Sequence, residues 1–347
     1  MASADGDAAL TAGSDVMLLM DERRRILFVG GKGGVGKTSL ASAIALARSR
    51  RGARVLVVST DPAHNLGHLW ERDVEDEPVR LAENSSGGCV DGMEIDPERT
   101  IARHLAAVEQ TMIRMLPERQ HAQAREHLER ARVAPGSHES AVLERIAEAA
   151  ELIDGDYDLV IFDTAPSGHT LRLLALPGQL AGWTDTLLRN RDRSERFSAA
   201  MRGLTGRVEQ GSSSEAELRR TLHLRRARFE NLQRAITDAE TCGFVVVFTA
   251  EALPVAETLE VVESLNGMHV DVAALIANRR SPNDAGDLLR ARRDVEDRHL
   301  RAVHAALPEI PVIEVPLVAG ELTGVEALGV LAELLQQEIV RPRTPQS

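Results

Sequence analysis

The chain has 347 residues, a formal net charge of −12 and 43% hydrophobic residues. This composition is typical of a globular protein, and the acidic balance argues against a general nucleic-acid binder, which needs a basic surface. No apolar run approaches the roughly 20 residues that span a bilayer. Cys89 and Cys242 lie far apart without a CxxC motif, which favours a reducing compartment. We therefore expect a cytoplasmic protein without nucleic-acid partners, whose role at any membrane is peripheral.

The two ends of the chain differ in composition from the rest. Residues 1–21 are small, polar and acidic and lack a basic start, so they predict a tail and not a secretion signal. Residues 341–347 predict a second short tail. Residues 22–340 are expected to form a single domain.

Six short apolar runs predict buried strands, at residues 25–29, 54–60, 159–162, 244–248, 270–277 and 312–315. Helical patterns separate most of these runs, and the first pattern covers residues 39–51. Continuous apolar strands that alternate with helices predict an α/β fold with a mostly parallel, doubly wound sheet.

Two stretches interrupt this alternation, at residues 97–155 and 179–241. Both are predicted to be helical insertions into the domain, and a Ser-rich segment at residues 210–214 predicts a flexible loop within the second. Apolar residues at helical spacing in residues 101–116 fit either core packing or a groove for a hydrophobic client.

Only two of the 41 basic residues are lysines, and both lie in one glycine-rich loop, Gly31-Lys32-Gly33-Gly34-Val35-Gly36-Lys37-Thr38. Elsewhere the chain uses arginine wherever a positive charge is needed. A slim ammonium group differs chemically from a planar guanidinium, so this loop needs lysine for a specific reason. Its position after a strand and before a helix predicts a P-loop that binds nucleotide phosphates.

The chemistry of a P-loop assigns roles along the segment. Backbone N–H groups and the helix N-terminus bind the β-phosphate, Lys37 bridges the β- and γ-phosphates, and the Thr38 hydroxyl binds Mg²⁺. The predicted ATP-binding residues of this loop are Gly30, Gly31, Lys32, Gly33, Gly34, Val35, Gly36, Lys37, Thr38 and Ser39.

Lys32 is additional to the P-loop pattern. If Lys37 already occupies the phosphates of its own loop, Lys32 could reach across a two-fold interface to the γ-phosphate of a partner, as an arginine finger does. The alternative is a solvated lysine, which the avoidance of lysine elsewhere in the chain disfavours.

Two aspartates follow predicted strands. Asp61 is placed to position the attacking water, and Asp163 fits a Walker-B aspartate that holds Mg²⁺ through water. His64 and His169 lie near them in the sequence, but too few ligands converge there for zinc, so no zinc is expected.

Three segments resemble a known family. The loop at residues 30–38 resembles the deviant Walker A of the MinD/NifH/ArsA branch of P-loop ATPases. The segment Ser59-Thr60-Asp61-Pro62-Ala63-His64-Asn65-Leu66 resembles switch I of the ArsA/Get subfamily. The segment Asp163-Thr164-Ala165-Pro166-Ser167-Gly168-His169-Thr170-Leu171-Arg172-Leu173-Leu174 resembles its switch II. The resemblance extends from about residue 25 to residue 335.

The resemblance implies further site residues and an assembly. Glu251 is similar to a nucleotide-contacting glutamate, Asn278 to the adenine-contacting asparagine, and Pro316 to the start of the adenine loop. Family members are homodimers with ATP at a composite interface, where the lysine matching Lys32 acts on the partner's nucleotide and the residue matching Asp61 activates water.

The family contains arsenical pump-driving ATPases and chaperones that target tail-anchored membrane proteins. The chain departs from both, because metalloid capture needs about three close thiolates and the chaperone's zinc-binding CxxC is absent. We expect an ATP- and Mg²⁺-dependent ATPase of pump-driving type, with a membrane transporter as partner. The alternatives are a chaperone with a hydrophobic client and a nucleotide-controlled scaffold; a metabolic kinase or synthetase fits less well.

Overall fold

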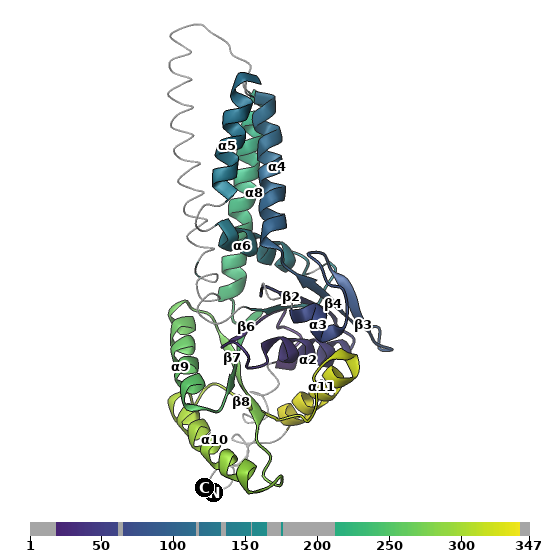
Figure 1. The fold of residues 1–347 in the computed structure, drawn as a ribbon, viewed down its shortest axis with the longest axis vertical. Helices are drawn as coiled ribbons and strands as arrows, with labels where there is room; N and C mark the ends of the chain where they lie inside the picture. The colour runs from purple at the N-terminus through teal and green to yellow at the C-terminus, as the bar shows by residue number, and fades with distance from the viewer. Residues whose placement is uncertain are drawn as a thin grey trace, which may run out of the picture. The chain divides into compact units, whose positions relative to one another are not determined.

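An eight-stranded sheet in the order β3-β4-β2-β5-β1-β6-β7-β8 is the centre of the structure, a computed structural model (Figure 1). It describes residues 19–61, 65–115, 118–132, 137–153, 155–164, 175 and 212–340. All neighbouring strands are parallel except β3, which pairs antiparallel with β4 at one edge. The strands are β1 (Ile26–Gly31), β2 (Arg54–Ser59), β3 (Val79–Glu83), β4 (Cys89–Glu94), β5 (Leu159–Asp163), β6 (Cys242–Thr249), β7 (Val272–Arg280) and β8 (Val312–Pro316).

Helices cover both faces of the sheet, as expected for a doubly wound α/β fold. On one face, α2 (Lys37–Ser49) packs against α11 (Gly324–Val340) and α3 (Asn65–Trp70). On the opposite face, α9 (Ala252–Gly267) packs on β6 and β7, and α10 (Asp287–Ala306) packs on α9 (Figure 1). The predicted α/β class with a mostly parallel sheet is confirmed.

Successive residues of the central strands contribute to two layers of apolar core, one on each face of the sheet. Leu27, Val29 and Val247 belong to the apolar cluster that includes α2 and α11. Phe28 lies between Leu27 and Val29 in the sequence, and its ring stacks on that of Phe162 with the ring centroids 4.9 Å apart. Because successive strand residues point to opposite faces, a parallel sheet with helices on both sides needs apolar side chains at every position.

The hairpin of β3 and β4 was not among the predicted strands. In β4, the buried Asp91 interrupts the apolar pattern, and it is tolerated because the Tyr157 hydroxyl donates a 2.7 Å hydrogen bond to it and Arg80 pairs with it. Gly92 follows, and a Cβ there would lie 2.5 Å from a methyl group of Leu81. A search for apolar runs does not detect this strand, because it contains a paired buried carboxylate and a closely packed glycine.

The chain divides into two compact units, and the sheet belongs to the one formed by Met1–Ile95, Ala149–Arg172 and Ala235–Ser347. The other unit, Asp96–Glu148 and Leu173–Arg234, is helical in its described part. Its elements are α4 (Pro97–Met115), η2 (Glu118–Gln120), α5 (His121–Arg132), most of α6 (Ser137–Ala150) and most of α8 (Ser212–Thr237).

The flexible loop predicted at residues 210–214 is wrong in its last three residues, because Ser212 begins α8. Serines followed by acidic residues favour a helix N-terminus, where hydroxyls cap free N–H groups and carboxylates meet the positive end of the helix dipole. The first two residues of the predicted loop lie outside the described residues.

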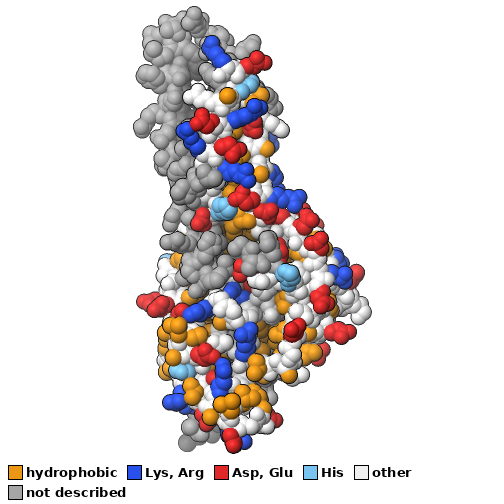
Figure 2. Space-filling model, viewed as in Figure 1, with side chains coloured by type: hydrophobic (Ala, Val, Ile, Leu, Met, Phe, Trp, Pro, Cys, Tyr) orange, Lys and Arg blue, Asp and Glu red, His pale blue; other side chains and the backbone are white. Residues whose placement is uncertain are grey.

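The surface of the helical unit carries charges of both signs. Figure 2 shows basic and acidic side chains interspersed over α4 and α5, and Arg125 pairs with Glu109 at 2.7 Å. Of the apolar face predicted in residues 101–116, Ile101 is buried and Leu105 is partly buried; the other side chains of that face lie outside the described residues. No helix in the described part of the chain has the length and apolar character needed to cross a membrane.

Candidate nucleotide-binding site

The loop that joins β1 to α2 has the backbone geometry that anion binding requires. Gly34 and Gly36 adopt positive φ angles of 80° and 95°, which glycine adopts without strain. Gly31 ends β1 at φ 146°, and a Cβ there would lie 2.1 Å from the Val247 carbonyl oxygen. The helix begins at Lys37, so its first N–H groups face the loop and form a site for a phosphate group.

The Lys37 side chain lies buried within this loop. Its ammonium Nζ donates a hydrogen bond of 3.1 Å to the Lys32 carbonyl oxygen. Burial lowers the pKa of Lys37, while the charges of Asp163 and Asp61 act in the opposite direction. The structure therefore brings the three charged residues predicted for phosphate and metal chemistry to one place.

The Thr38 hydroxyl donates a 2.7 Å hydrogen bond to Asp163 Oδ2. Asp163 ends β5 and is 1% exposed, and its second oxygen, Oδ1, has no hydrogen-bond partner among the described residues. Burial raises the pKa of Asp163 to about 7, although the bond from Thr38 and the charge of Lys37 lower it. A buried carboxylate with a free oxygen is costly unless something binds it.

These two residues fit Mg²⁺. This ion takes oxygen ligands and is commonly bound through one or two protein groups, with waters and substrate phosphates completing its shell. A threonine hydroxyl in contact with a buried carboxylate at the start of a phosphate-binding helix meets that requirement. Across the described ranges, no group of three or more His, Cys, Asp or Glu side chains could hold a metal ion.

The raised pKa of Asp163 predicts a specific pH dependence of stability. Between its usual value near 4 and its folded value near 7, the folded protein binds the extra proton, so the free energy of unfolding falls as pH rises through this window. Asp163→Asn removes the buried charge. Without nucleotide and metal, we expect its stability advantage over wild type to be about 2–3 kcal/mol larger at pH 8 than at pH 5.

Denaturant unfolding at both pH values, in the presence of a chelator, measures this difference. A difference between the two proteins that does not change with pH would contradict the assignment of a near-neutral pKa to Asp163.

Asp61 follows β2 at the same edge of the sheet and is partly buried. Its backbone N–H contacts Ser59 Oγ at 3.4 Å, and its charge acts on both Lys37 and Asp163. The remainder of the predicted switch I at residues 62–64, including His64, lies outside the described residues, as do residues 165–174 of switch II with His169.

Lys32 points to α9 and not to the Thr38–Asp163 pair. Its ammonium forms a 2.9 Å ion pair with Glu257 Oε1, and its side chain is 43% exposed. The other carboxylate oxygen of Glu257 is buried without a hydrogen-bond partner in the described part of the chain. The two lysines of the loop therefore have different surroundings.

Asn278 lies against the P-loop. Its side-chain Nδ2 donates a 2.8 Å hydrogen bond to the Val35 carbonyl oxygen, and a Cβ on Gly36 would lie 2.5 Å from that nitrogen. Its Oδ1 accepts a hydrogen bond of 2.9 Å from the Arg279 N–H. The strand predicted to end at residue 277 continues to Arg280, so Asn278 belongs to β7.

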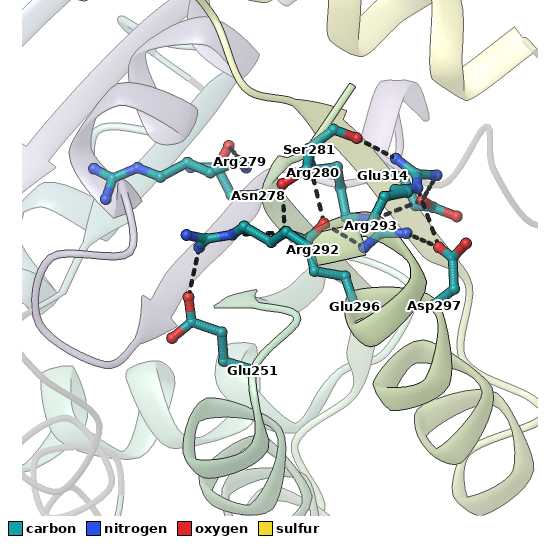
Figure 3. A network of polar contacts seen from close by, with 10 residues as sticks. All are labelled: Glu251, Asn278, Arg279, Arg280, Ser281, Arg292, Arg293, Glu296, Asp297 and Glu314. Carbon is teal, nitrogen blue, oxygen red and sulfur yellow. Dashed lines mark hydrogen bonds and ion pairs between the residues drawn. The ribbon is translucent and has the colours of Figure 1, made fainter. Parts of the chain in front are cut away.

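Among the described residues, the other two predicted nucleotide contacts form no hydrogen bond or ion pair with the P-loop. Glu251 precedes α9, and its Oε1 accepts a 2.8 Å hydrogen bond from Arg292 of α10. Pro316 ends β8 opposite Arg280 of β7. Glu257, Arg280 and Arg292 were not predicted, because each acts through a partner distant in sequence (Figure 3 shows the last two).

The chain is similar to known ATPases over nearly its whole length. The family model described as anion-transporting ATPase matches residues 24–337. The chain is 30% identical over 312 residues to the putative arsenical pump-driving ATPase 2 of Aquifex aeolicus, covering 90% of this chain and 99% of that protein. It is 30% identical to ATPase get3 of Schizosaccharomyces pombe, covering 94% and 95%, and 31% identical to ATPase GET3A of Arabidopsis thaliana, covering 90% and 83%. The chain therefore belongs to the ArsA/Get family of P-loop ATPases.

Proposed function

We propose that this ATPase hydrolyses ATP in a Mg²⁺-dependent reaction at the loop formed by residues 30–39. The observation that carries the proposal is the Thr38–Asp163 contact of 2.7 Å, which leaves Asp163 Oδ1 buried and without a hydrogen-bond partner among the described residues. Thr38 and Asp163 would hold Mg²⁺, Asp163 through water. The bound ion would neutralise charge on the phosphates and favour the ionised form of Asp163.

The remaining residues have separate roles in this proposal. Lys37 binds the β- and γ-phosphates, and Asp61 orients the attacking water and accepts its proton. Asn278 and Pro316 contact the base, and Glu251 contacts the nucleotide. Support comes from the Asn278–Val35 hydrogen bond and from the electrostatic interaction that Asp61 makes with Lys37 and Asp163.

The active form is proposed to be a homodimer in which Lys32 acts on the partner's nucleotide. Its partly exposed ammonium is held by Glu257 on α9, away from the Thr38–Asp163 pair of its own chain. Closure of the dimer around ATP would exchange that ion pair for the partner's γ-phosphate. Hydrolysis would then reverse the contact and release the switch segments.

We propose that this cycle drives a membrane transporter or a client protein, in the cytoplasm or at the membrane surface. The name of the Aquifex relative favours a pump-driving role. The chaperone alternative is favoured by the cysteines: both are free and buried, and burial raises the pKa of Cys89 and raises that of Cys242 to about 12. Neither thiol is therefore prepared to bind a metalloid as thiolate. Stimulation of hydrolysis by a transmembrane-helix peptide and not by antimonite would assign the chaperone role.

Asp61→Asn tests the hydrolytic mechanism. The amide keeps the size of the side chain but cannot accept the proton of the attacking water, so we expect kcat to fall about a hundredfold while ATP binding is retained. Phosphate release under saturating ATP and Mg²⁺, together with the dissociation constant of ATP, measures both quantities. Hydrolysis by Asp61→Asn at the wild-type rate would contradict the role of Asp61 and favour a nucleotide-controlled scaffold.

A further inference from the structure

A buried arginine lies beside the nucleotide site and is surrounded by carboxylates. Arg280, the last residue of β7, is 1% exposed. Its guanidinium pairs with Glu296 at 2.7 Å, with Glu314 at 2.8 Å and with Asp297 (Figure 3). A charge this deeply buried is retained only with full pairing, and the planar fork of arginine can hold three carboxylates at once.

This pairing fixes an irregularity in β7 that faces the P-loop. The register between β7 and β8 shifts between Ala277 and Arg280, and Arg279 adopts a left-handed φ of 58°, which is uncommon for a residue other than glycine. In Figure 3, Arg279 points away from the cluster and Arg280 points into it. The bulge thereby lets Asn278 reach the Val35 carbonyl oxygen while Arg280 stays anchored.

A chain of hydrogen bonds connects the buried carboxylate of Glu296 to Glu251. Glu296 accepts hydrogen bonds from the Ser281 N–H at 3.0 Å and from the Ser281 hydroxyl at 2.7 Å. It also accepts one from Arg292 Nε at 3.1 Å, and the other end of that guanidinium donates to Glu251 Oε1 at 2.8 Å. Burial raises the pKa of Glu296, but the bonds from Ser281 and the two arginines outweigh it and lower the pKa overall. Glu296 is therefore an ionised centre to which both arginines are tied.

We propose that the cluster of Arg280, Ser281, Arg292 and Glu296 is a positioning device for the nucleoside side of the ATP site. Arg280, the buried member of the cluster, stabilises the bulge that places Asn278 against the P-loop. Arg292 orients the carboxylate of Glu251. The inference rests on the proposed function, since it assigns a supporting role to residues that are themselves proposed to contact nucleotide.

The ion pair between Arg292 and Glu251 is exposed, so its effect on nucleotide binding can be measured apart from its effect on stability. The side chains of Arg292 and Glu251 are each 54% exposed, and an ion pair so exposed contributes little to the stability of the fold. Loss of Arg292 also removes one hydrogen bond to the buried Glu296, which keeps its bonds from Arg280 and Ser281, so only a modest loss of stability should accompany the weaker nucleotide binding. Arg290 offers a matched control, because it lies on the same helix and its only ion pair within the described part of the chain is with the exposed Asp287.

The test compares Arg292→Gln with Arg290→Gln in the full chain. Calorimetric titration with ADP and Mg²⁺ gives the dissociation constant, and thermal unfolding without nucleotide gives the stability. We expect Arg292→Gln to bind ADP about fivefold more weakly with a fall of only a few degrees in the midpoint, and Arg292→Lys to recover part of the loss of affinity. Arg290→Gln should match wild type in both measurements.

A double-mutant cycle shows whether Arg292 acts through Glu251. If it does, Arg292→Gln adds no further loss of ADP affinity to Glu251→Gln. Additive losses, or wild-type affinity in Arg292→Gln when Glu251→Gln binds weakly, would overturn the inference. Wild-type affinity in both variants would also overturn the inference, because it would show that Glu251 does not contribute to the nucleotide site. Failure of the proposed function would appear differently, as a wild-type protein that neither binds ADP nor hydrolyses ATP.

Discussion

Replacement of Lys37 with alanine is expected to lower kcat for ATP hydrolysis by about a thousandfold. Lys37 is 7% exposed, and its ammonium donates a hydrogen bond to the Lys32 carbonyl oxygen within the glycine-rich loop. Asp163 and Asp61 both act on it, so the charge that must meet the γ-phosphate is already surrounded by the groups proposed to hold Mg²⁺ and water. Without it, charge developing on the phosphates loses its nearest cation.

The matched variant is Lys37→Arg, which keeps the charge. A planar guanidinium does not fit where a single ammonium extends along the loop, so this variant should also be inactive. Thermal unfolding of both variants checks that the fold is retained. A Lys37→Ala protein that keeps more than about a tenth of the wild-type rate would contradict the phosphate-binding role of the loop.

Replacement of Lys32 with alanine is expected to lower kcat by about a hundredfold and to leave ADP binding almost unchanged. In the single chain, the Lys32 ammonium pairs with Glu257 at 2.9 Å and does not contact the Thr38–Asp163 pair. A group that stabilises the transition state from a partner affects the rate of the chemical step more than the affinity for the product. The rate under saturating ATP and the dissociation constant of ADP measure the two effects.

Glu257→Gln is the control for Lys32. It removes the charge that holds Lys32 but keeps the lysine itself, so hydrolysis should continue within about threefold of the wild-type rate. Equal and large losses in Lys32→Ala and Glu257→Gln would instead mean that the ion pair shapes the loop of its own chain. That result would remove the reason to assign Lys32 to the partner's nucleotide.

Local patterns in the sequence predicted the elements whose function depends on a few consecutive residues. The P-loop is such an element, because its glycines, lysine and threonine follow one another between a strand and a helix. The apolar strands were predicted for the same reason, since burial on both faces leaves a continuous run. The helix starts at Lys37, two residues before its predicted start, because loop and helix share the phosphate-binding residues.

Contacts between distant residues were beyond this kind of prediction. Glu257 meets Lys32 across 225 positions, and Arg280 reaches Glu314 across 34. The bulge that places Asn278 depends on this buried pairing, and its backbone strain at Arg279 has no signal in the local sequence. Such features follow from the order of strands in the sheet, which the pattern of apolar runs does not specify.

Mixing two inactive proteins tests most directly whether the ATP site is shared between two chains. In a mixed dimer of Lys32→Ala and Asp61→Asn, one site combines an intact Asp61 with an intact Lys32 from the partner. Free exchange of subunits should then restore about a quarter of the wild-type hydrolysis rate, since about half of the dimers carry one functional site of two. Mixtures no more active than the separate variants, under conditions where exchange of labelled subunits is observed, would contradict the account.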